Sequence, residues 1–280
     1  MRNFINDEVI TYVDGLRKLN TITKYPSILT YHNLGPKGSL VDSLVEDRNF
    51  ENKPIFITEK IDGTNSRIVF ITGANGEVVD YIIGSREELL FAFGDRIVNP
   101  ALGVVNNLKP IADTVMLLSD GNAPLNPNSM YCVYGETYGG NINGAKQYSG
   151  HGTYGIRFFD MWQMPLDHVL DLMEMPIDKI SNWREHAGQP FAHVDVLERF
   201  CGDFGLVRVP YIRETVGTEI PNDLQGVWEW MQEFANSDAK IDTDGKGMSE
   251  GVVVRYADRS LIRKIRFEDY MRTKKMGLIK

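Results

Sequence analysis

Residues 59–65 read Glu-Lys-Ile-Asp-Gly-Thr-Asn, and apolar, β-branched runs flank them on both sides. The runs 54–58 and 67–71 predict two strands, so this stretch lies where one strand ends and the next begins. A lysine at a strand end, followed by Asp62-Gly63, can project from a tight turn into a cleft. Taken alone, the Lys-x-Asp-Gly pattern is a weak signal, because a surface turn is its more common explanation.

The sequence around this stretch favours strands, and helical patterns occur farther along the chain. Gly-Ala-Asn-Gly at 73–76 predicts a hairpin turn that connects the strand at 67–71 to a strand at 78–83. Antiparallel sheets with helices packed around them, an α+β fold, account for this order of elements. Further strands are predicted at 130–135, 156–159, 251–256 and 260–266, and helices at 6–19, 166–173, 193–204 and 224–234.

Five short motifs follow residues 59–65 in a fixed order, and together they carry more information than any one of them. The chain resembles the covalent nucleotidyltransferase superfamily of ATP-dependent DNA ligases, RNA ligases and mRNA capping enzymes, over most of its length. Within it, residues 59–65 look most like the RNA ligases that seal nicks in duplexes. The motifs are Ser85-Arg86, Tyr134-Gly135-Glu136, Phe158-Phe159-Asp160, Glu250-Gly251-Val252-Val253 and Lys264-Ile265-Arg266.

The resemblance implies that Lys60 attacks the α-phosphate of ATP and carries AMP covalently. A free lysine is almost wholly protonated at neutral pH, and burial or nearby cations make its amine more nucleophilic. Lys264 and Arg266 are the expected cations, and they would also neutralise charge on the α-phosphate. Their i, i+2 spacing on a strand sends both side chains to one face. A basic surface strand is the alternative explanation.

The resemblance gives the two motif glutamates different roles. Glu136 is expected to accept a hydrogen bond from the ATP ribose. Glu250 is expected near the phosphates, where it would help to bind Mg²⁺, an ion that prefers carboxylate and phosphate oxygens and keeps several waters. An exposed glutamate without a catalytic role is the alternative at either position.

The remaining candidates are nucleotide-binding residues that the resemblance implies. Phe159 is expected to stack on adenine, with Phe158 facing the core. Glu59 is expected beside the adenine, with its backbone contributing to base recognition. Arg86 is expected to engage a nucleotide or substrate phosphate through its forked guanidinium. Asp160 is a weaker candidate, expected only to brace the basic residues.

Two positions distinguish the subfamily. Asn65 stands where DNA ligases and capping enzymes usually carry arginine, and it follows the RNA-ligase pattern. Asp62 is the superfamily-wide choice, whereas duplex RNA ligases often have histidine there. This combination argues against close kinship with any one well-known ligase.

The domain organisation follows from the same resemblance. Residues 1–50 are expected to pack on the same domain as a helix and loop segment, residues 51–280 to form the nucleotidyltransferase domain, and residues 161–248 to be a helical elaboration. Only 14 residues follow Arg266, so no C-terminal OB domain is expected. A partner protein that supplies a substrate-binding domain stays an open alternative.

Composition is consistent with an enzyme that binds phosphates, although it does not identify one. The net charge is −8, yet residues 255–280 hold nine Lys or Arg against three acids. A basic segment on an acidic body suits an RNA backbone, and it equally suits a solvated tail. The two cysteines form no CxxC pair, so neither a zinc site nor a disulfide framework is expected. No apolar run reaches the roughly 20 residues of a membrane span, so a soluble cytoplasmic protein without a membrane partner is expected.

The expected activity is therefore that of an ATP-dependent RNA ligase, with RNA as nicked duplex or broken ends and with ATP and Mg²⁺. Two rival functions stay open. One is a minimal ATP-dependent DNA ligase, and the other is a non-catalytic RNA-binding module on the same fold.

Overall fold

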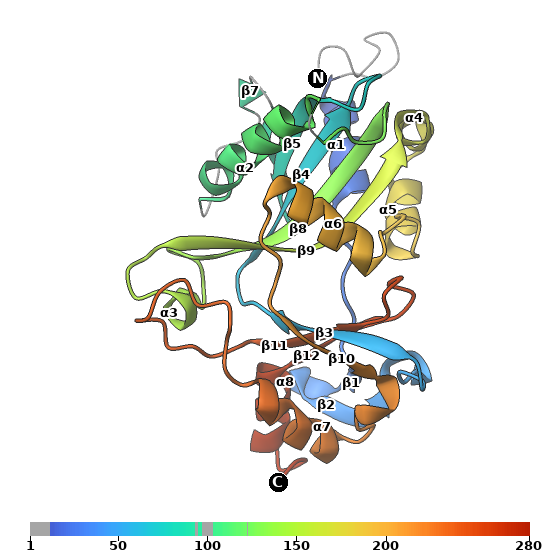
Figure 1. Cartoon of the computed structure of the whole chain (residues 1–280). Coiled ribbons are helices and arrows are strands. Elements are labelled where there is room, and N and C mark those ends of the chain that lie inside the picture. The colour runs from blue at the N-terminus through green and yellow to red at the C-terminus, as the bar shows by residue number, and fades with distance from the viewer. Residues whose placement is uncertain (1–11, 93–94, 97–102, 122) are drawn as a thin grey trace. The chain divides into compact units, whose positions relative to one another are not determined.

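The computed structural model describes residues 12–92, 95–96, 103–121 and 123–280. They form two compact units, each assembled from separate stretches of the chain (Figure 1). Among the described residues, the first unit comprises 12–27, 64–92, 95–96, 103–121, 123–137 and 154–207, and the second comprises 28–63, 138–153 and 208–280. The chain passes from the second unit to the first between Gly63 and Thr64, within the Lys-x-Asp-Gly stretch at 59–65.

The first unit is built on a six-stranded sheet with the strand order β7-β6-β5-β4-β8-β9. Strand pairs whose register is described run antiparallel. The last two residues of β8 already belong to the second unit. The strands are β4 (Thr64–Thr72), β5 (Val78–Ser85), β6 (Leu89–Ala92), β7 (Asp95–Arg96), β8 (Ser129–Gly139) and β9 (Tyr154–Pro165), and the helices are α1 (Tyr12–Thr23), α2 (Val104–Ser119), α4 (Leu166–Glu174), α5 (Ile177–Glu185) and α6 (Val194–Phe204).

Helices pack against both faces of this sheet. Successive side chains of a strand point to opposite faces, and those of β4 enter two different core clusters. On β4, Ile68 and Phe70 join the cluster that contains α2 and α6. Val69 and Ile71 join the cluster that contains α1, α4 and α5. The unit is therefore a sheet between two helical layers, which explains why Ile68–Ile71 of β4 are apolar in succession instead of alternating with polar residues.

The second unit is built on a four-stranded sheet with the order β10-β3-β11-β12, and its neighbouring strands are antiparallel. A two-stranded hairpin and α7 and α8 accompany this sheet (Figure 1). The strands are β1 (His32–Leu34), β2 (Leu40–Leu44), β3 (Pro54–Lys60), β10 (Tyr211–Val216), β11 (Gly251–Arg255) and β12 (Ile262–Arg266), and the α-helices are α3 (Ala145–Tyr148), α7 (Leu224–Met231) and α8 (Phe267–Lys275).

Side-chain alternation on the second sheet separates a core face from a face with polar residues. Ile55 and Ile57 of β3 are fully buried among residues of α7 and α8, whereas Phe56, Thr58 and Lys60 are only half-buried. The functional candidates Lys60, Lys264 and Arg266 all occupy half-buried positions of their strands.

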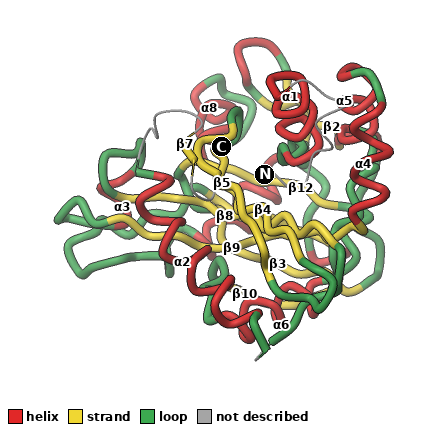
Figure 2. The backbone as a smooth tube through the Cα atoms, turned by 90° about the horizontal axis from the view of Figure 1, so that it is seen from above, coloured by secondary structure: helices red, strands yellow, loops and turns green. Residues whose placement is uncertain are grey.

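The predicted α+β fold of antiparallel sheets with surrounding helices is confirmed. Figure 2 shows the helices and strands of the described residues by type. Helix α1 extends to Thr23, four residues beyond the predicted end, and residues 6–11 of that prediction lie outside the described residues. The predicted helix at 224–234 ends at Met231 and continues as a 3-10 turn over Gln232–Phe234. Helices α2, α3, α5 and α8 were not predicted. No helix of the described residues is long and apolar enough to cross a bilayer.

Candidate functional site

Lys60 and Glu250 lie next to each other in the second unit, because β3 and β12 both pair with β11. Gly251 is opposite Lys60 on β3 and opposite Arg266 on β12. The Nζ atom of Lys60 lies 2.5 Å from Oε2 of Glu250, and Nη1 of Arg266 lies 3.9 Å from Oε1 of the same carboxylate. The side chains of Lys60, Glu250 and Arg266 are 23%, 17% and 27% exposed. Three of the predicted site residues therefore share one partly exposed ionic cluster.

Gly251 allows this close approach of the strands. Its φ is +150°, a value that side-chain-bearing residues rarely adopt. A Cβ atom there would lie 2.1 Å from the carbonyl oxygen of Ile265 and 2.9 Å from Cα of Arg266. Any larger residue would push β12 away and move Arg266 from Glu250.

Arg266 is oriented by a carboxylate that was not predicted from the sequence. Its Nε and Nη2 atoms donate to the two oxygens of Asp269, at 2.9 Å and 2.8 Å. Asp269 is 1% exposed and lies three residues later on α8. Such a two-point contact fixes the plane of a guanidinium. The i, i+3 spacing of an arginine and an aspartate at a helix start was the available signal.

Lys264 lies two residues before Arg266 on β12, and both side chains are half-buried, while the neighbouring Arg263 and Ile265 are buried. The backbone of Lys264 accepts a hydrogen bond from Tyr31 and donates one to Leu29. The alternation agrees with the expectation that Lys264 and Arg266 occupy one face of the strand.

Asp62 belongs to the same turn as Lys60, and the segment between β8 and β9, which contains α3, lies against this turn. The backbone N–H of Asp62 donates to the hydroxyl of Tyr148, at 2.7 Å, and Tyr148 is fully buried. A Cβ atom on Gly144 would lie 2.3 Å from Oδ2 of Asp62. Burial raises the pKa of the Asp62 carboxyl, and the charge of Glu250 raises it further, while Lys60 acts in the opposite direction.

Glu59 is 3% exposed, and its carboxylate is already engaged. It accepts hydrogen bonds from the hydroxyl of Ser237 at 2.5 Å and from the N–H of Asp238 at 2.9 Å. Burial raises the pKa of the Glu59 carboxyl, against the effect of these hydrogen bonds. The backbone N–H of Glu59 donates to the carbonyl of Pro210 at 2.9 Å. In this conformation, the side chain of Glu59 anchors the chain segment at Ser237.

Asn65 and Glu136 belong to the first unit, where they are directly opposite each other on β4 and β8. Both side chains are half-buried. The Oδ1 atom of Asn65 is buried and has no hydrogen-bond partner among the described residues. A buried amide oxygen without a donor is uncommon in folded proteins, so this position is suited to a ligand that brings a hydroxyl or N–H group.

Phe159 and Asp160 lie on β9 of the first unit, around the ring of Tyr25. The ring of Phe159 is half-buried and meets that of Tyr25 edge to face, at 5.1 Å between centroids. The hydroxyl of Tyr25 donates to Oδ2 of Asp160 at 2.9 Å, and Oδ1 of Asp160 accepts from the N–H of Met161. Phe158 is buried in the core as expected. Asp160 therefore holds the tyrosine that packs against the proposed adenine stacker.

Arg86 lies on the turn between β5 and β6, and its side chain is 63% exposed. Its Nε atom is 3.6 Å from Oε1 of Glu87. The carbonyls of Ser85 and Arg86 accept hydrogen bonds from Arg67, a fully buried arginine that was not predicted from the sequence. The apolar run Ile68–Ile71 directly after Arg67 was a signal that its charge would be buried.

The donor set of the second unit suits a metal that arrives with phosphates. Among the described residues, no group of three or more His, Cys, Asp or Glu could hold a metal ion by itself. The carboxylates of Glu250 and Asp62 lie near enough for their charges to interact. Two carboxylates beside Lys60 and Arg266 fit an Mg²⁺ ion that keeps waters and phosphate oxygens as its other ligands.

The predicted site residues are thus divided between the units. Lys60, Glu250 and Arg266 form one cluster in the second unit, together with Asp62. In the first unit, Asn65 and Glu136 form a cross-strand pair, Phe159 lies on β9, and Arg86 lies on the turn between β5 and β6.

Comparison with known proteins gives a family and a fold. Residues 53–274 match the RNA ligase family. An apo mutant of the Naegleria gruberi RNA ligase superposes with a TM-score of 0.53 at 14% identity, covering 92% of this chain and 58% of that chain. A second apo mutant of a Naegleria gruberi RNA ligase superposes with a TM-score of 0.52 at 16% identity, covering 91% of this chain and 59% of that chain. A further mutant of a Naegleria gruberi RNA ligase, with ATP and Mn, superposes with a TM-score of 0.50 at 16% identity, covering 91% of this chain and 59% of that chain.

These likenesses concern the fold, since the identities are low. The chain spans about three fifths of the length of these solved ligases. No curated protein sequence is significantly similar to it. The family match extends from the residue before β3 to the last turn of α8, and so includes every residue of the ionic cluster. The chain belongs to the RNA ligase family.

Proposed function

We propose that this protein is an ATP-dependent RNA ligase that joins a 3′-hydroxyl to a 5′-phosphate. The observation that carries the proposal is the contact between Lys60 and Glu250 at the end of β3, 2.5 Å between Nζ and Oε2, in a chain of the RNA ligase family. A lysine in a half-buried cluster beside carboxylates and an arginine is equipped for phosphorus chemistry.

The proposed reaction has three displacements at phosphorus. The amine of Lys60 attacks the α-phosphorus of ATP, a P–N bond forms, and pyrophosphate leaves. The 5′-phosphate of RNA then attacks the same phosphorus, which restores Lys60 and leaves AMP on the RNA end. Finally, the 3′-hydroxyl attacks the RNA 5′-phosphorus, and AMP leaves as the phosphodiester forms. Positioning and charge stabilisation account for most of the catalysis in such steps.

The described residues support separate roles in these steps. Arg266, held by Asp269, presents a fixed guanidinium next to Lys60 and Glu250, and we assign it with Lys264 to the α-phosphate. Glu250 is the proposed metal ligand. A bound Mg²⁺ would orient the pyrophosphate and offset its charge. A Naegleria gruberi ligase of similar fold was solved with ATP and Mn, which supports a nucleotide and a divalent ion here.

The residues of the first unit supply the proposed nucleoside contacts. The Oδ1 atom of Asn65, to which no described residue donates, is a ready acceptor, and Glu136 opposite it is assigned to the ribose. Phe159 is assigned to the adenine face and Arg86 to a phosphate. For Glu59, in the second unit, we keep the proposed place beside the adenine through its backbone. Its carboxylate instead anchors Ser237 and Asp238.

The proposal includes the domain assignment and the cellular setting. We propose residues 51–280 as the nucleotidyltransferase region, residues 161–248 as its helical elaboration, and residues 1–50 as a segment packed on it. A partner protein that supplies a further substrate-binding domain is compatible with this arrangement. Because RNA and ATP are both intracellular, the proposed activity implies a cytoplasmic protein.

The test is the mass of the intact protein after incubation with ATP and Mg²⁺. An increase equal to one AMP, located on Lys60 by peptide mapping, is the expected result. Sealing of nicked and broken RNA by the same preparation completes the test. A protein that binds ATP but gains no mass would contradict the lysyl-AMP route.

A further inference from the structure

Arg67 is a fully buried arginine at the centre of the first unit's sheet. It lies on β4, opposite Gly84 on β5 and Tyr134 on β8, and its relative exposure is 0%. Burial lowers the pKa of its guanidinium. Its acceptors among the described residues are uncharged oxygens of Thr23, Ser85, Arg86 and Asn20. No carboxylate accepts a hydrogen bond from Arg67 among the acceptors described, and the charge of Glu87 only partly offsets the effect of burial. Burying a charge without a directly paired opposite charge is costly, so Arg67 is a poor choice for stability alone.

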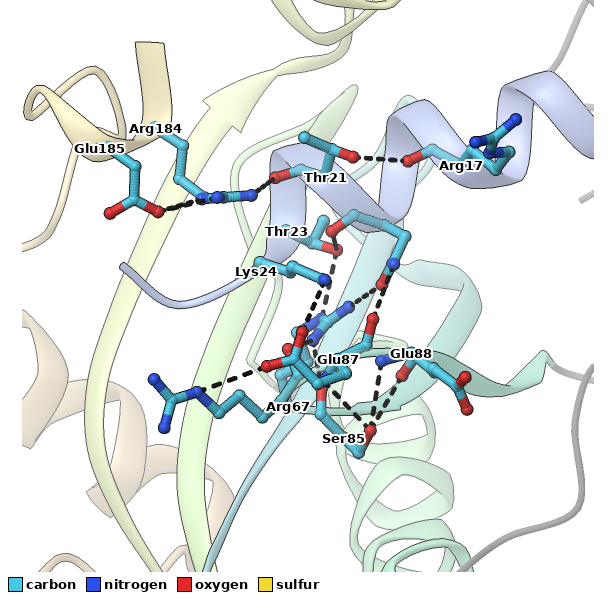
Figure 3. A network of polar contacts seen from close by, with 12 residues as sticks. Arg17, Thr21, Thr23, Lys24, Arg67, Ser85, Glu87, Glu88, Arg184 and Glu185 are labelled. Carbon is cyan, nitrogen blue, oxygen red and sulfur yellow. Dashed lines mark hydrogen bonds and ion pairs between the residues drawn. The ribbon is translucent and has the colours of Figure 1, made fainter. Parts of the chain in front are cut away.

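The guanidinium connects two segments that lie far apart in the sequence (Figure 3). Its Nη1 atom donates to the carbonyls of Ser85 and Arg86, the latter at 3.4 Å. Its Nε atom donates to the hydroxyl of Thr23 at 3.2 Å, and Nη2 donates to Oδ1 of Asn20 at 2.5 Å. One planar group therefore fixes the turn between β5 and β6 relative to the last turn of α1.

Asn20 completes this connection from the helix side. Its Nδ2 atom donates to the carbonyl of Glu87 at 2.9 Å, and Lys24 forms an ion pair with the Glu87 carboxylate at 2.8 Å. Within the turn, the hydroxyl oxygen of Ser85 accepts from the N–H groups of Glu87 and Glu88, at 3.3 Å and 3.2 Å. Three successive backbone carbonyls, those of residues 85–87, thus have side-chain donors from outside the turn.

Gly84 provides the space that the guanidinium occupies. A Cβ atom on Gly84 would lie 2.9 Å from Cζ and 3.0 Å from Nε of Arg67. Those atoms belong to a side chain held by hydrogen bonds, so it could not move aside easily. The absence of a side chain at Gly84 is therefore required for the guanidinium of Arg67 to lie where it does.

Arg86 is at the centre of the held turn, and its side chain extends into solvent. Its backbone carbonyl is bonded to Arg67, while its side chain is 63% exposed. A fixed backbone under an exposed guanidinium lowers the entropy lost when that guanidinium binds a phosphate. The same turn without its carbonyl contacts would let the guanidinium sample a larger volume.

We propose that Arg67 and Asn20 are positioning residues for Arg86, and that they place its guanidinium for a phosphate of the nucleotide or of the RNA. This inference rests on the proposed ligase function. It assigns α1, the N-terminal helix, a part in the reaction, because Asn20 and Thr23 of α1 hold the turn directly or through Arg67.

The test is a double-mutant cycle between Asn20→Ala and Arg86→Ala. Asn20 is chosen because it is only half-buried, whereas a substitution of Arg67 would leave buried carbonyls unbonded and could prevent folding. Thr21→Ala is the matched control on the same helix, because its hydroxyl donates to the carbonyl of Arg17 within α1. Rates of AMP attachment and of nick sealing are measured separately, together with the melting temperature of each variant.

The expected result is a loss of about five- to tenfold for Asn20→Ala in the step that Arg86→Ala slows, within the usual range for coupled neighbours. In the Arg86→Ala background the same substitution should change that rate less than about twofold. Thr21→Ala should behave as the parent protein in both backgrounds.

Three outcomes would overturn the inference, and one of them also removes the proposed function. Equal losses in both backgrounds would show that Asn20 acts by stability alone. If Arg86→Ala is unimpaired in both AMP attachment and nick sealing, Arg86 has no role in these steps and a positioning role for Asn20 and Arg67 is excluded. In these two cases AMP attachment by the parent protein is intact. A parent protein that takes up no AMP contradicts the ligase itself.

Discussion

The Nζ atom of Lys60 lies 2.5 Å from Oε2 of Glu250, although the two residues are 190 positions apart in the chain. An amine attacks phosphorus with a free lone pair, so this contact must open before the proposed reaction. Glu250 therefore has two successive roles in the proposal. It holds Lys60 at the end of β3 in the free protein, and it offers a carboxylate to a metal when ATP binds.

Replacing the nucleophile should abolish AMP attachment without unfolding the protein. Lys60→Ala removes the amine from a half-buried position whose chain neighbours Glu59 and Ile61 stay in place. We expect at least a thousandfold loss, on the order seen when a covalent nucleophile is removed. Labelled AMP transfer from ATP measures it, with circular dichroism as the folding control. Undiminished labelling of folded Lys60→Ala would falsify the assignment.

Magnesium should distinguish Glu250 from Lys264. Glu250→Ala should slow adenylylation about 10²- to 10³-fold, the range for losing one charge-stabilising group, and added Mg²⁺ should recover part of this loss. Lys264→Ala should stay slow at saturating Mg²⁺, because a fixed cation at the α-phosphate is missing. Rates of both variants over a magnesium titration provide the measurement. Full recovery of Lys264→Ala by metal would show that our role for this lysine is wrong.

The nucleotide should be ATP. Ligases attach AMP, whereas capping enzymes attach GMP, and the motif set of this chain resembles the ligases. Equal concentrations of labelled ATP and GTP, incubated with the protein and Mg²⁺, should give an adduct with ATP only. Preferential attachment of GMP would move the protein to the capping enzymes while leaving Lys60 as the nucleophile.

A nick with a ribonucleotide 3′ end should be the preferred substrate. The Oδ1 atom of Asn65, which accepts no hydrogen bond from the described residues, can bind a hydroxyl of a terminal ribose, and duplex RNA presents 2′-hydroxyls that DNA lacks. Nicked duplexes that differ only in the sugars at the 3′-hydroxyl end, with unpaired strands as a third substrate, make the comparison. Equal sealing of DNA and RNA 3′ ends would favour a minimal DNA ligase, and preference for unpaired strands would favour the repair of broken loops.

The salt dependence of substrate binding tests the contacts to the RNA backbone. Basic residues near the C-terminal end, such as Arg272, Lys274 and Lys275, are candidates for sequence-independent phosphate contacts. With about four such contacts, affinity should fall roughly a hundredfold between about 50 and 200 mM salt. Arg272 already pairs with Glu268, so Lys275→Ala should reduce the slope more cleanly than Arg272→Ala. A slope that is unchanged in Lys275→Ala would place the RNA elsewhere.

Acid should destabilise the second unit through His32. This side chain is fully buried, with Nδ1 2.6 Å from the hydroxyl of Tyr270 and Nε2 2.9 Å from the carbonyl of Asn222. Burial lowers the pKa of His32 below its ordinary value of 6.5, although the Asn222 hydrogen bond and nearby aspartates oppose the shift. The unfolded chain therefore binds a proton more readily than the folded protein, so stability falls as pH decreases below 6.5 towards the lowered pKa.

Thermal unfolding between about pH 7 and pH 5 checks this expectation. His32→Gln keeps a polar side chain but removes the titrating ring, so its melting temperature should fall less over that pH range. His168→Gln, at an exposed position of α4, serves as the control and should behave as the parent protein. The same acid sensitivity in all three proteins would assign the effect to other groups.

The sequence by itself determined the local elements and the order of the motifs. Alternating or continuous β-branched runs predicted β3, β4, β5 and their hairpin turn, because strand formation there depends on neighbouring residues. The Lys-x-Asp-Gly stretch at Lys60 and its companion motifs were sufficient to indicate the ligase family, since the motifs follow one another along the chain in the order of that family. In contrast, α8 was missed, because Phe267–Lys275 contains many charged residues and its buried face is made by only a few positions.

Only the tertiary structure decided which distant residues meet and what each carboxylate does. Lys60 reaches Glu250 because β11 pairs with β3 and β12 in one register, and no local pattern encodes that register. Glu59 is expected beside a base through its backbone, and only the structure shows that its carboxylate binds Ser237 and Asp238 across 178 and 179 residues. Arg67 is charged by sequence, yet it is buried because Gly84 leaves room and four distant oxygens accept hydrogen bonds from its guanidinium. Such contacts depend on packing between segments, whereas periodicity reports only what neighbouring residues do.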